Sequence, residues 1–268
     1  MEQEKKVQGS LVGAFVVGGC IAVAMQVVMM LLGSVLPAEA SALIPAISLI
    51  ILGLVGMVLV LTGVYAKLNE IGGYGAAIMF CGLVDAASGI FVGETMANKG
   101  DRSAGVKGAL KFAVAILGSI IVVGTVLGLA LGAAGNPGAI ATATDATPNP
   151  GPISLLYAFL CAGIISIVGQ AMLENTPLPL PAVILIEGAI GALTAVFGLF
   201  GKLEALCGAG LICTVVDAGG SMVAGGTLIS IAGAPQRTVI TIIVMAIVVL
   251  IGIVTGNILV NRIEAQQK

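Results

Sequence analysis

The sequence predicts an all-α polytopic membrane protein. Hydrophobic residues make up 59% of its 268 residues, charged residues make up only 9%, and the mean hydropathy is +1.18. A soluble globular domain is about one-quarter charged, so a chain this poor in charge could not cover a surface that faces water. Lipid must therefore solvate most of its exterior, and we expect an integral protein of the bilayer.

Six apolar segments are long enough to cross a membrane as single helices. Each has about 20 or more residues with almost no charge, which matches the thickness of the hydrocarbon core. They are residues 10–36, 42–66, 110–134, 153–173, 180–200 and 239–260.

Two further apolar segments, residues 71–97 and 206–234, differ from these spans. Both are interrupted by glycine, and each carries an aspartate near its middle, Asp85 or Asp217. Broken backbone at membrane depth is tolerated only inside protein or beside a water-filled cavity. We predict that each segment forms a broken re-entrant helical hairpin, so that each half of the chain has about three transmembrane helices plus one hairpin.

The basic residues favour this topology. If residues 71–97 re-enter, the basic residues of the first half fall on one side of the membrane, namely Lys5, Lys6, Lys67, Lys99, Arg102, Lys107 and Lys111. Three crossings is an odd number, so the second half would be inverted relative to the first. The alternative is eight full spans with parallel repeats.

Residues 135–152 separate membrane repeat 1, residues 1–134, from membrane repeat 2, residues 153–268. This stretch is rich in Gly, Pro, Thr and Ala. Such a composition breaks helices, so we predict a loop that links the two halves.

The two halves share residues in the same order, which indicates an internal duplication. The match of Val84-Asp85-Ala86 with Val216-Asp217-Ala218 makes the two aspartates equivalent. It implies that repeat 2 is about three residues shorter than repeat 1 just before the aspartate. The matches are Ser10, Leu11, Ala14, Phe15, Gly19, Ile21 and Gln26 with Ser154, Leu155, Ala158, Phe159, Gly163, Ile165 and Gln170; Pro45-Ala46 with Pro181-Ala182; Gly63, Lys67, Leu68, Gly73 and Gly75 with Gly198, Lys202, Leu203, Gly208 and Gly210; and Val84-Asp85-Ala86 with Val216-Asp217-Ala218.

Carboxylates within the apolar segments are the candidate functional residues, because an ionisable group in hydrocarbon costs roughly 2.5–3.5 kcal/mol on insertion scales. They are Asp85, Asp217, Glu94 and Glu187. Duplicated segments interrupted by glycine commonly mark a transport site, so we place the site where the two hairpins meet. The alternative is that each aspartate caps a half-helix or pairs with a neighbouring donor, and that Glu187 reaches the membrane interface. The glycines expected to keep the path open are Gly75, Gly82, Gly89, Gly210 and Gly219.

The densest charge in the chain lies between residues 99 and 111. Its basic members are Lys99, Arg102, Lys107 and Lys111. We interpret them as topological signals on the cytoplasmic side, with a second role at a pore mouth, where they would attract an anion.

Several functions are disfavoured by what the sequence lacks. It has no His, the commonest general base and metal ligand, and it has no phosphate loop and no convincing nucleophile–base pair. We therefore expect no enzymatic activity and no cofactor. The few basic residues are scattered, so we expect no binding to nucleic acid.

The chain resembles the stage V sporulation protein A (SpoVA) membrane family, as a tandem fusion of an AC-like first half and an AE-like second half. The resemblance rests on a Gly-x-Ile…Gln element, a Gly-(Val/Leu)-Tyr-x-Lys element and a Gly-Ala-Gly element. In repeat 1 these are Gly19-Cys20-Ile21…Gln26, Gly63-Val64-Tyr65-Ala66-Lys67 and Gly73-Tyr74-Gly75; in repeat 2 they are Gly163-Ile164-Ile165…Gln170, Gly198-Leu199-Phe200-Gly201-Lys202 and Gly208-Ala209-Gly210. In the run that follows, Asp85 stands where the family has Asn.

The resemblance implies a channel or transporter subunit that moves a small anionic metabolite, dipicolinic acid as its calcium chelate, across the inner membrane of bacterial endospores. It implies as partners a soluble dipicolinate-binding subunit and other membrane subunits of the same system, and a homo-oligomer is also compatible. Asp85 and Asp217 would then make transient contacts to calcium.

The competing hypotheses are an ion-coupled carrier or energy-transducing subunit that uses intramembrane Asp and Glu, and a membrane scaffold that transports nothing. A cavity lined by basic side chains and helix N-termini would favour an anion, whereas clustered carboxylates would favour a cation.

Overall fold

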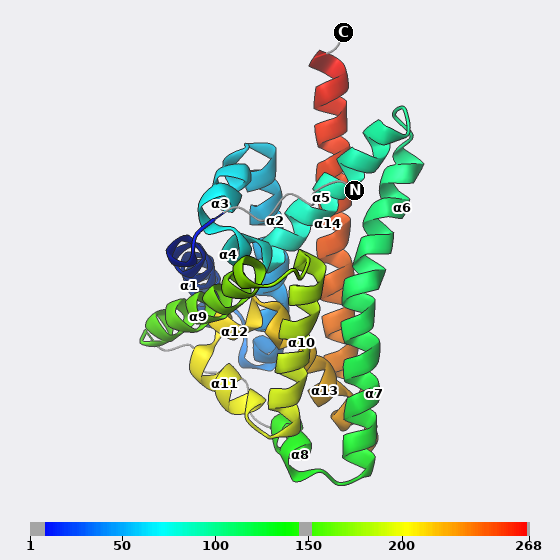
Figure 1. The fold of residues 1–268 in the computed structure, drawn as a ribbon. Coiled ribbons are helices and arrows are strands. Elements are labelled where there is room, and N and C mark those ends of the chain that lie inside the picture. The colour runs from blue at the N-terminus through cyan, green and yellow to red at the C-terminus, as the bar shows by residue number, and fades with distance from the viewer. Residues whose placement is uncertain (1–8, 145–151, 267–268) are drawn as a thin grey trace.

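The computed structural model describes residues 9–144 and 152–266, and within these ranges every regular element is helical, which confirms the all-α class (Figure 1). The elements are α1 (Leu11–Val35), η1 (Ala38–Leu43), α2 (Ile44–Leu61), α3 (Val64–Gly72), α4 (Tyr74–Ala77), α5 (Phe80–Ala97), α6 (Arg102–Ala113), η2 (Val114–Gly118), α7 (Ser119–Ala133), α8 (Pro137–Thr144), α9 (Ser154–Asn175), α10 (Leu180–Val196), α11 (Phe200–Cys207), α12 (Ala209–Ile212), α13 (Val215–Ala232) and α14 (Gln236–Gln266).

The chain is an integral membrane protein. Seven of the described helices, counting α6 to α7 and η1 to α2 as continuous, are long and apolar enough to span a membrane. The bent pair α10 and α11, with 110° between its arms, makes eight if it counts as one span. Large apolar side chains such as Val35, Val114 and Phe197 are mostly exposed, as expected of a surface that faces lipid rather than water.

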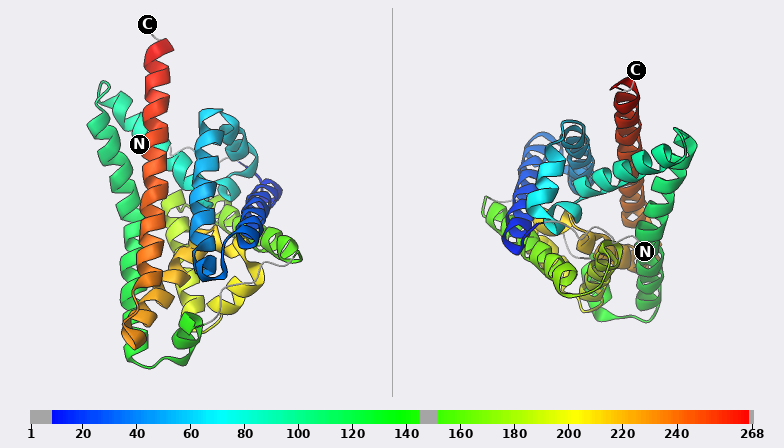
Figure 2. Two further views of the ribbon diagram at one scale, coloured as in Figure 1. Left: turned by 180° about the vertical axis from the view of Figure 1, so that it is seen from behind. Right: turned by 45° about the horizontal axis from the view of Figure 1, so that its top comes forward.

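Corresponding helices of the two halves run in opposite directions. In Figure 1, the chain runs downward through α6 and α7 and upward through α14 beside them. It runs downward through α10 in Figure 1 and upward through α2, the lighter blue helix in Figure 2. Helices α1 and α9 cross antiparallel, because Phe15 of α1 lies against Gly163, and Phe159 of α9 lies against Gly19. The rings of Phe15 and Phe159 meet edge to face, with centroids 5.2 Å apart.

Residues 64–101 leave one end of the molecule and return to it. Arg262 near the end of α14 donates to the carbonyl oxygen of Leu61 at the end of α2, at 2.7 Å. Arg102 at the start of α6 pairs with Glu264 of α14, at 3.0 Å. The chain therefore enters α3 and leaves α5 at the same end, with a break at Ile78 and Met79 in the interior.

The second broken segment does the same at the other end. Gly132 near the end of α7 packs on Ser230 near the end of α13, and Gly138 of α8 packs on Val196 at the end of α10. The arms of both hairpins are unequal. The first arms, α4 and α12, are single turns, whereas α5 and α13 each have 18 residues.

The predicted equivalence of Asp85 and Asp217 is wrong. From Gly73 to the start of α5 and from Gly208 to the start of α13 the chain has the same number of residues, so the expected three-residue shortening is absent. Contacts fix the register: Gly56 packs on Cys81, and Gly191 packs on Val216. In this register the counterpart of Asp85 is Gly220, and the counterpart of Asp217 is Gly82.

Part of the predicted linker loop is a helix. Asn136 accepts a hydrogen bond from the backbone N–H of Ala139 at 2.8 Å, and Pro137 occupies the first turn, where its missing N–H costs nothing. Thr142 of the resulting helix α8 donates to the carbonyl oxygen of Ala195 at 3.1 Å. Residues 145–151 of the predicted linker lie outside the described ranges.

Each half packs its long hairpin helix on the last helix of the other half. Gly124 and Gly128 of α7 pack on α13 at Met222 and Val223, and Gly252 and Gly256 of α14 pack on α5 at Ala87 and Phe91. These are the small-residue contacts that allow helix backbones to approach closely in a bilayer.

Candidate transport site

Two cavities lie on either side of the molecular centre. The first half-cavity, about 570 Å³, is lined by α3, α5, η2 and α10 and includes Asn69, Asp85 and Ile184. The second half-cavity, about 320 Å³, is lined by α2, α11, α13 and α14 and includes Leu49, Glu204 and Asp217. Each cavity is built mainly by one half of the chain. The main exceptions are α10 of the second half, which lines the first half-cavity, and α2 of the first half, which lines the second.

Asp85 is the intramembrane acid of the first half-cavity. Its Oδ2 accepts a hydrogen bond from Nδ2 of Asn69 at 2.8 Å. Glu70, which follows Asn69 in α3, lines the same cavity and is exposed. Apolar residues of η2 and α10 form most of the remaining wall, and the ionisable side chains that line this cavity, Glu70 and Asp85, are both acidic.

The second half-cavity holds a cluster of four polar side chains. Arg237 Nη2 pairs with Glu204 Oε2 at 3.0 Å and donates to Ser221 Oγ at 3.2 Å. The Ser221 hydroxyl lies 3.4 Å from Oδ1 of Asp217, which is only 7% exposed. The guanidinium also stacks over Phe200, 5.9 Å from the ring centroid. One cation here faces two acidic side chains, so Arg237 can balance only one of them.

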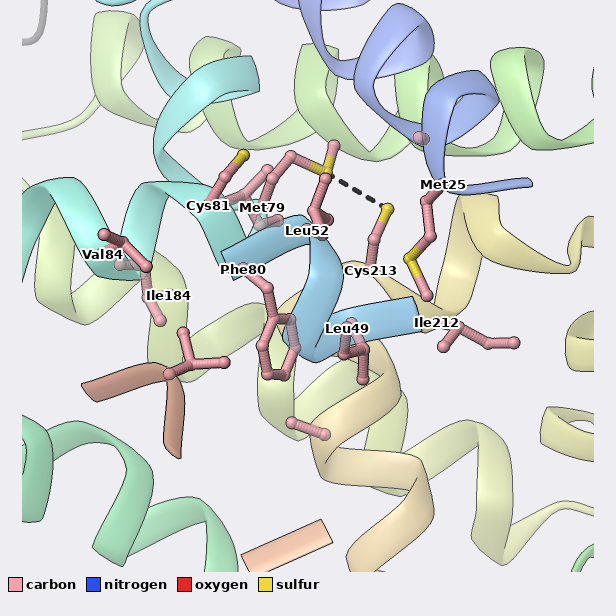
Figure 3. Packing of buried hydrophobic residues seen from close by; sticks show 14 of the residues in the cluster. Met25, Leu49, Leu52, Met79, Phe80, Cys81, Val84, Ile184, Ile212 and Cys213 are labelled. Atoms are coloured by element: carbon pink, nitrogen blue, oxygen red, sulfur yellow. Dashed lines mark hydrogen bonds between the residues drawn. The ribbon is translucent and has the colours of Figure 1, made fainter. Parts of the chain in front are cut away.

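The two half-cavities meet where the two hairpins touch. Phe80 and Ala218 line both cavities. The backbone N–H of Phe80 donates to the carbonyl oxygen of Cys213 at 3.2 Å, and the Cys213 thiol donates to the sulfur of Met79 at 3.4 Å (Figure 3). Both α5 and α13 begin at this contact without a side-chain cap, and Asp217 lies in the first turn of α13.

Comparison with known proteins supports the resemblance for the first half. Residues 10–134 match the SpoVAC/SpoVAEB sporulation membrane protein family. This match runs from the N-cap of α1 to the end of α7, which is predicted repeat 1, and the fusion with an AE-like second half stays a prediction. Neither a curated protein nor a solved structure matches the chain.

Of the acids singled out in this SpoVA-like sequence, two line cavities and two do not. Asp85 and Asp217 lie in different half-cavities, so they do not form one calcium site. Within the described residues no group of three or more His, Cys, Asp or Glu could hold a metal ion. Glu94 of α5 is exposed and lies against Gly108 of α6, and Glu187 is buried outside both cavities.

Most of the predicted pore glycines have other roles. Gly82 lines the first half-cavity. A Cβ at Gly75, Gly210 or Gly219 would overlap a backbone carbonyl oxygen of a neighbouring helix, so these three allow close helix packing. Gly89 is exposed with open space around it.

The predicted basic pore mouth lies away from the cavities. Lys99, Arg102, Lys107 and Lys111 are all exposed along the α5–α6 turn and α6. Arg102 is engaged by Asn257, Asn261 and Glu264 of α14. These residues fit the topological role better than contact with a solute.

Sequence reasoning missed several polar residues that line the cavities, among them Asn69, Glu204, Ser221 and Arg237. A signal existed, because Asn69 and Glu204 each lie two residues after the lysine of the Gly-x-x-x-Lys element in their half. Arg237 carried no such signal, since it begins a long apolar segment and looks like a boundary charge.

Proposed function

We propose that this chain is the membrane-embedded subunit of a transport system, and that its solute path runs through the two half-cavities. The observation that carries the proposal is that the two cavities share Phe80 and Ala218 in their linings. The SpoVAC/SpoVAEB match adds a sporulation membrane family to this geometry. A non-transporting scaffold has no need for two cavities that hold acidic side chains inside a lipid-solvated bundle.

The cavity chemistry supports a solute that presents both a cation and carboxylates. Glu70 and Asp85 face one cavity and Asp217 and Glu204 face the other, whereas Arg237 is paired with Glu204. A free dianion would meet repulsion at both mouths. Calcium dipicolinate, which the family resemblance implies, would offer its metal to the carboxylates. Its own carboxylates would suit the uncapped helix ends at the constriction.

We further propose that the two halves are inverted duplicates, so that one chain supplies both an AC-like and an AE-like membrane subunit. Paired contacts at a constant register support this, such as Gly56 on Cys81 and Gly191 on Val216. In inverted repeats the transport site lies at the repeat interface near the midplane, as it would here. The partners would be a soluble dipicolinate-binding subunit and further membrane subunits in the spore inner membrane, and the chain would carry out no covalent chemistry.

Purified protein in liposomes tests the proposal by flux of calcium dipicolinate, free dipicolinate and simple inorganic ions. We expect the chelate to be favoured, and we expect Asp85→Asn and Asp217→Asn to change rate or selectivity. Glu94→Gln is the matched control, because this carboxylate is exposed outside both cavities. The site is misplaced if the double aspartate variant transports all solutes at wild-type rates.

An ion-coupled carrier is the second candidate. Acidic side chains that outnumber the cations in both half-cavities are the observation that favours it. In the same liposomes, uphill movement of solute driven by a sodium or proton gradient would support the carrier, and strictly downhill flux would support the channel.

A further inference from the structure

Glu187 is a buried acid that neither half-cavity uses. It lies in the middle of α10, is 1% exposed, and has no hydrogen-bond partner for either carboxylate oxygen among the described residues. The hydroxyl of Tyr74 on α4 is likewise buried without a partner there. The phenol of Tyr74 and the carboxyl of Glu187 lie close enough to interact electrostatically, so the two buried groups are neighbours.

Among the described residues, no cation is paired with this carboxyl. Helix α10 packs on α13, α8, α9, α7, α11 and η2, and none of α7, α8 or η2 carries an acidic or basic residue. The titratable residues on the other three are Tyr157, Cys161, Glu174, Lys202, Glu204, Cys207 and Asp217, and none of them acts on Glu187. An unpaired carboxylate in such surroundings is strongly unfavourable, whereas the neutral acid is tolerated.

The other half of the molecule shows that the fold does not require an acid here. In the register fixed by Gly56 and Gly191, the counterpart of Glu187 is Leu52, and the counterpart of Tyr74 is Ala209. Leu52 is 6% exposed, and Ala209 is fully buried. The surrounding contacts are preserved, because Gly53 packs on Val248 of α14 and Gly188 packs on Ile120 of α7. The second half therefore has the polar residue Glu187, a neighbour of Tyr74, at a position where the first half has the apolar residue Leu52, and the apolar residue Ala209 stands at the position that corresponds to Tyr74.

We infer that Glu187 is a proton-binding site, and that its proton is released when α4 and α10 separate during transport. A metal ion would need several oxygen ligands, and only one carboxyl and one phenol are present. Ile184, one turn before Glu187 on α10, lines the first half-cavity, which gives the proton an exit to solvent. The coupling rests on the proposed transport function, whereas proton binding does not.

Helix α4 is the element able to expose this site. It is a single turn between Gly73, with φ of 47°, and the break at Met79. Its first N–H, that of Tyr74, donates to Oε1 of Gln170 at 2.8 Å, and Nε2 of Gln170 donates to Glu174 at 2.9 Å. Movement of α4 relative to α9 and α10 would hydrate the carboxyl, which would then lose its proton to water.

Infrared spectroscopy of the purified protein tests proton binding without any flux. We expect a carbonyl band of protonated carboxylic acid at neutral pH that loses intensity in Glu187→Gln and keeps it in Glu94→Gln. Glu187→Leu, which installs the residue of the opposite half, is the second variant and is expected to fold and to show the same loss. A wild-type spectrum identical to that of Glu187→Gln at neutral pH would overturn the proposal.

The coupling is tested by the pH profile of flux in liposomes. We expect a pH-dependent rate in the wild type and a flattened profile in both Glu187→Gln and Glu187→Leu. Identical profiles of all three proteins would overturn the coupling. Absence of flux in every protein would count against the proposed transport function, and the infrared result would still decide whether Glu187 binds a proton.

Discussion

Gln26 of α1 accepts a hydrogen bond at 2.8 Å from the backbone N–H of Ala209, the first residue of α12 in the opposite half. Gln170 of α9 accepts the reciprocal bond from Tyr74 of α4, also at 2.8 Å. Gly73 and Gly208 precede these N–H groups with φ of 47° and 51°, a turn that favours glycine. Each half therefore completes the broken hairpin of the other.

Loss of either glutamine should destabilise the fold. Gln26→Ala leaves the N–H of Ala209 buried without a partner, and Gln170→Ala does the same at Tyr74, each at a cost of about 1–3 kcal/mol. Thermal unfolding in detergent measures the effect, with the exposed Gln236→Ala as the control. Unchanged melting temperatures would show that these bonds do not hold the halves together.

Alanine at Gly191 should be far more damaging than alanine at Gly89. A Cβ at Gly191 would overlap the carbonyl oxygen of Val216, so α10 must move away from α13, at about 1–3 kcal/mol or more. Gly89 has nothing within 4 Å, and alanine is the better helix former there. Melting temperatures of the two variants, compared in the same detergent, check the difference; equal values would contradict the packing described for α10.

The topology is open to a cysteine-accessibility test. Gly100 lies at the end where α14 finishes, and Gly135 lies past α7 at the other end (Figure 1). Cysteines placed at these positions, in a background without the five native cysteines, should be labelled by an impermeant reagent from opposite sides of the membrane. Labelling of both from one side would contradict an odd number of crossings between them.

Removal of Arg237 should destabilise the second half-cavity. Glu204 and Asp217 would then face each other without a counter-charge, which we expect to cost about 3 kcal/mol in Arg237→Gln. The double variant Arg237→Gln with Glu204→Gln should recover much of that loss, because it removes the unpaired charge. A double variant no more stable than the single one would show that the ion pair is not the source of the effect.

Truncation of Phe80 should widen the path. Its side chain lines both half-cavities, so Phe80→Ala is expected to raise downhill flux of calcium dipicolinate several-fold. Phe112 lines only the first half-cavity, and Phe112→Ala is the matched control. Equal rates in the two variants would place the constriction elsewhere.

The sequence by itself determined the membrane class, the apolar spans, the two glycine-broken segments and the carboxylates within them, because span length, charge content and helix breaking are local properties of the chain. It did not determine the register of the second hairpin. The match of Val84-Asp85-Ala86 with Val216-Asp217-Ala218 looked convincing, but the backbone contact of Gly191 on Val216 decides that Asp217 corresponds to Gly82. It also did not distinguish glycines that line a cavity, such as Gly82, from glycines that allow close packing of a neighbouring helix, such as Gly75. Only tertiary structure brings Arg237 to Glu204 and Tyr74 to Glu187, since these contacts depend on how closely particular helix faces approach, and hydropathy carries no information about which face meets which.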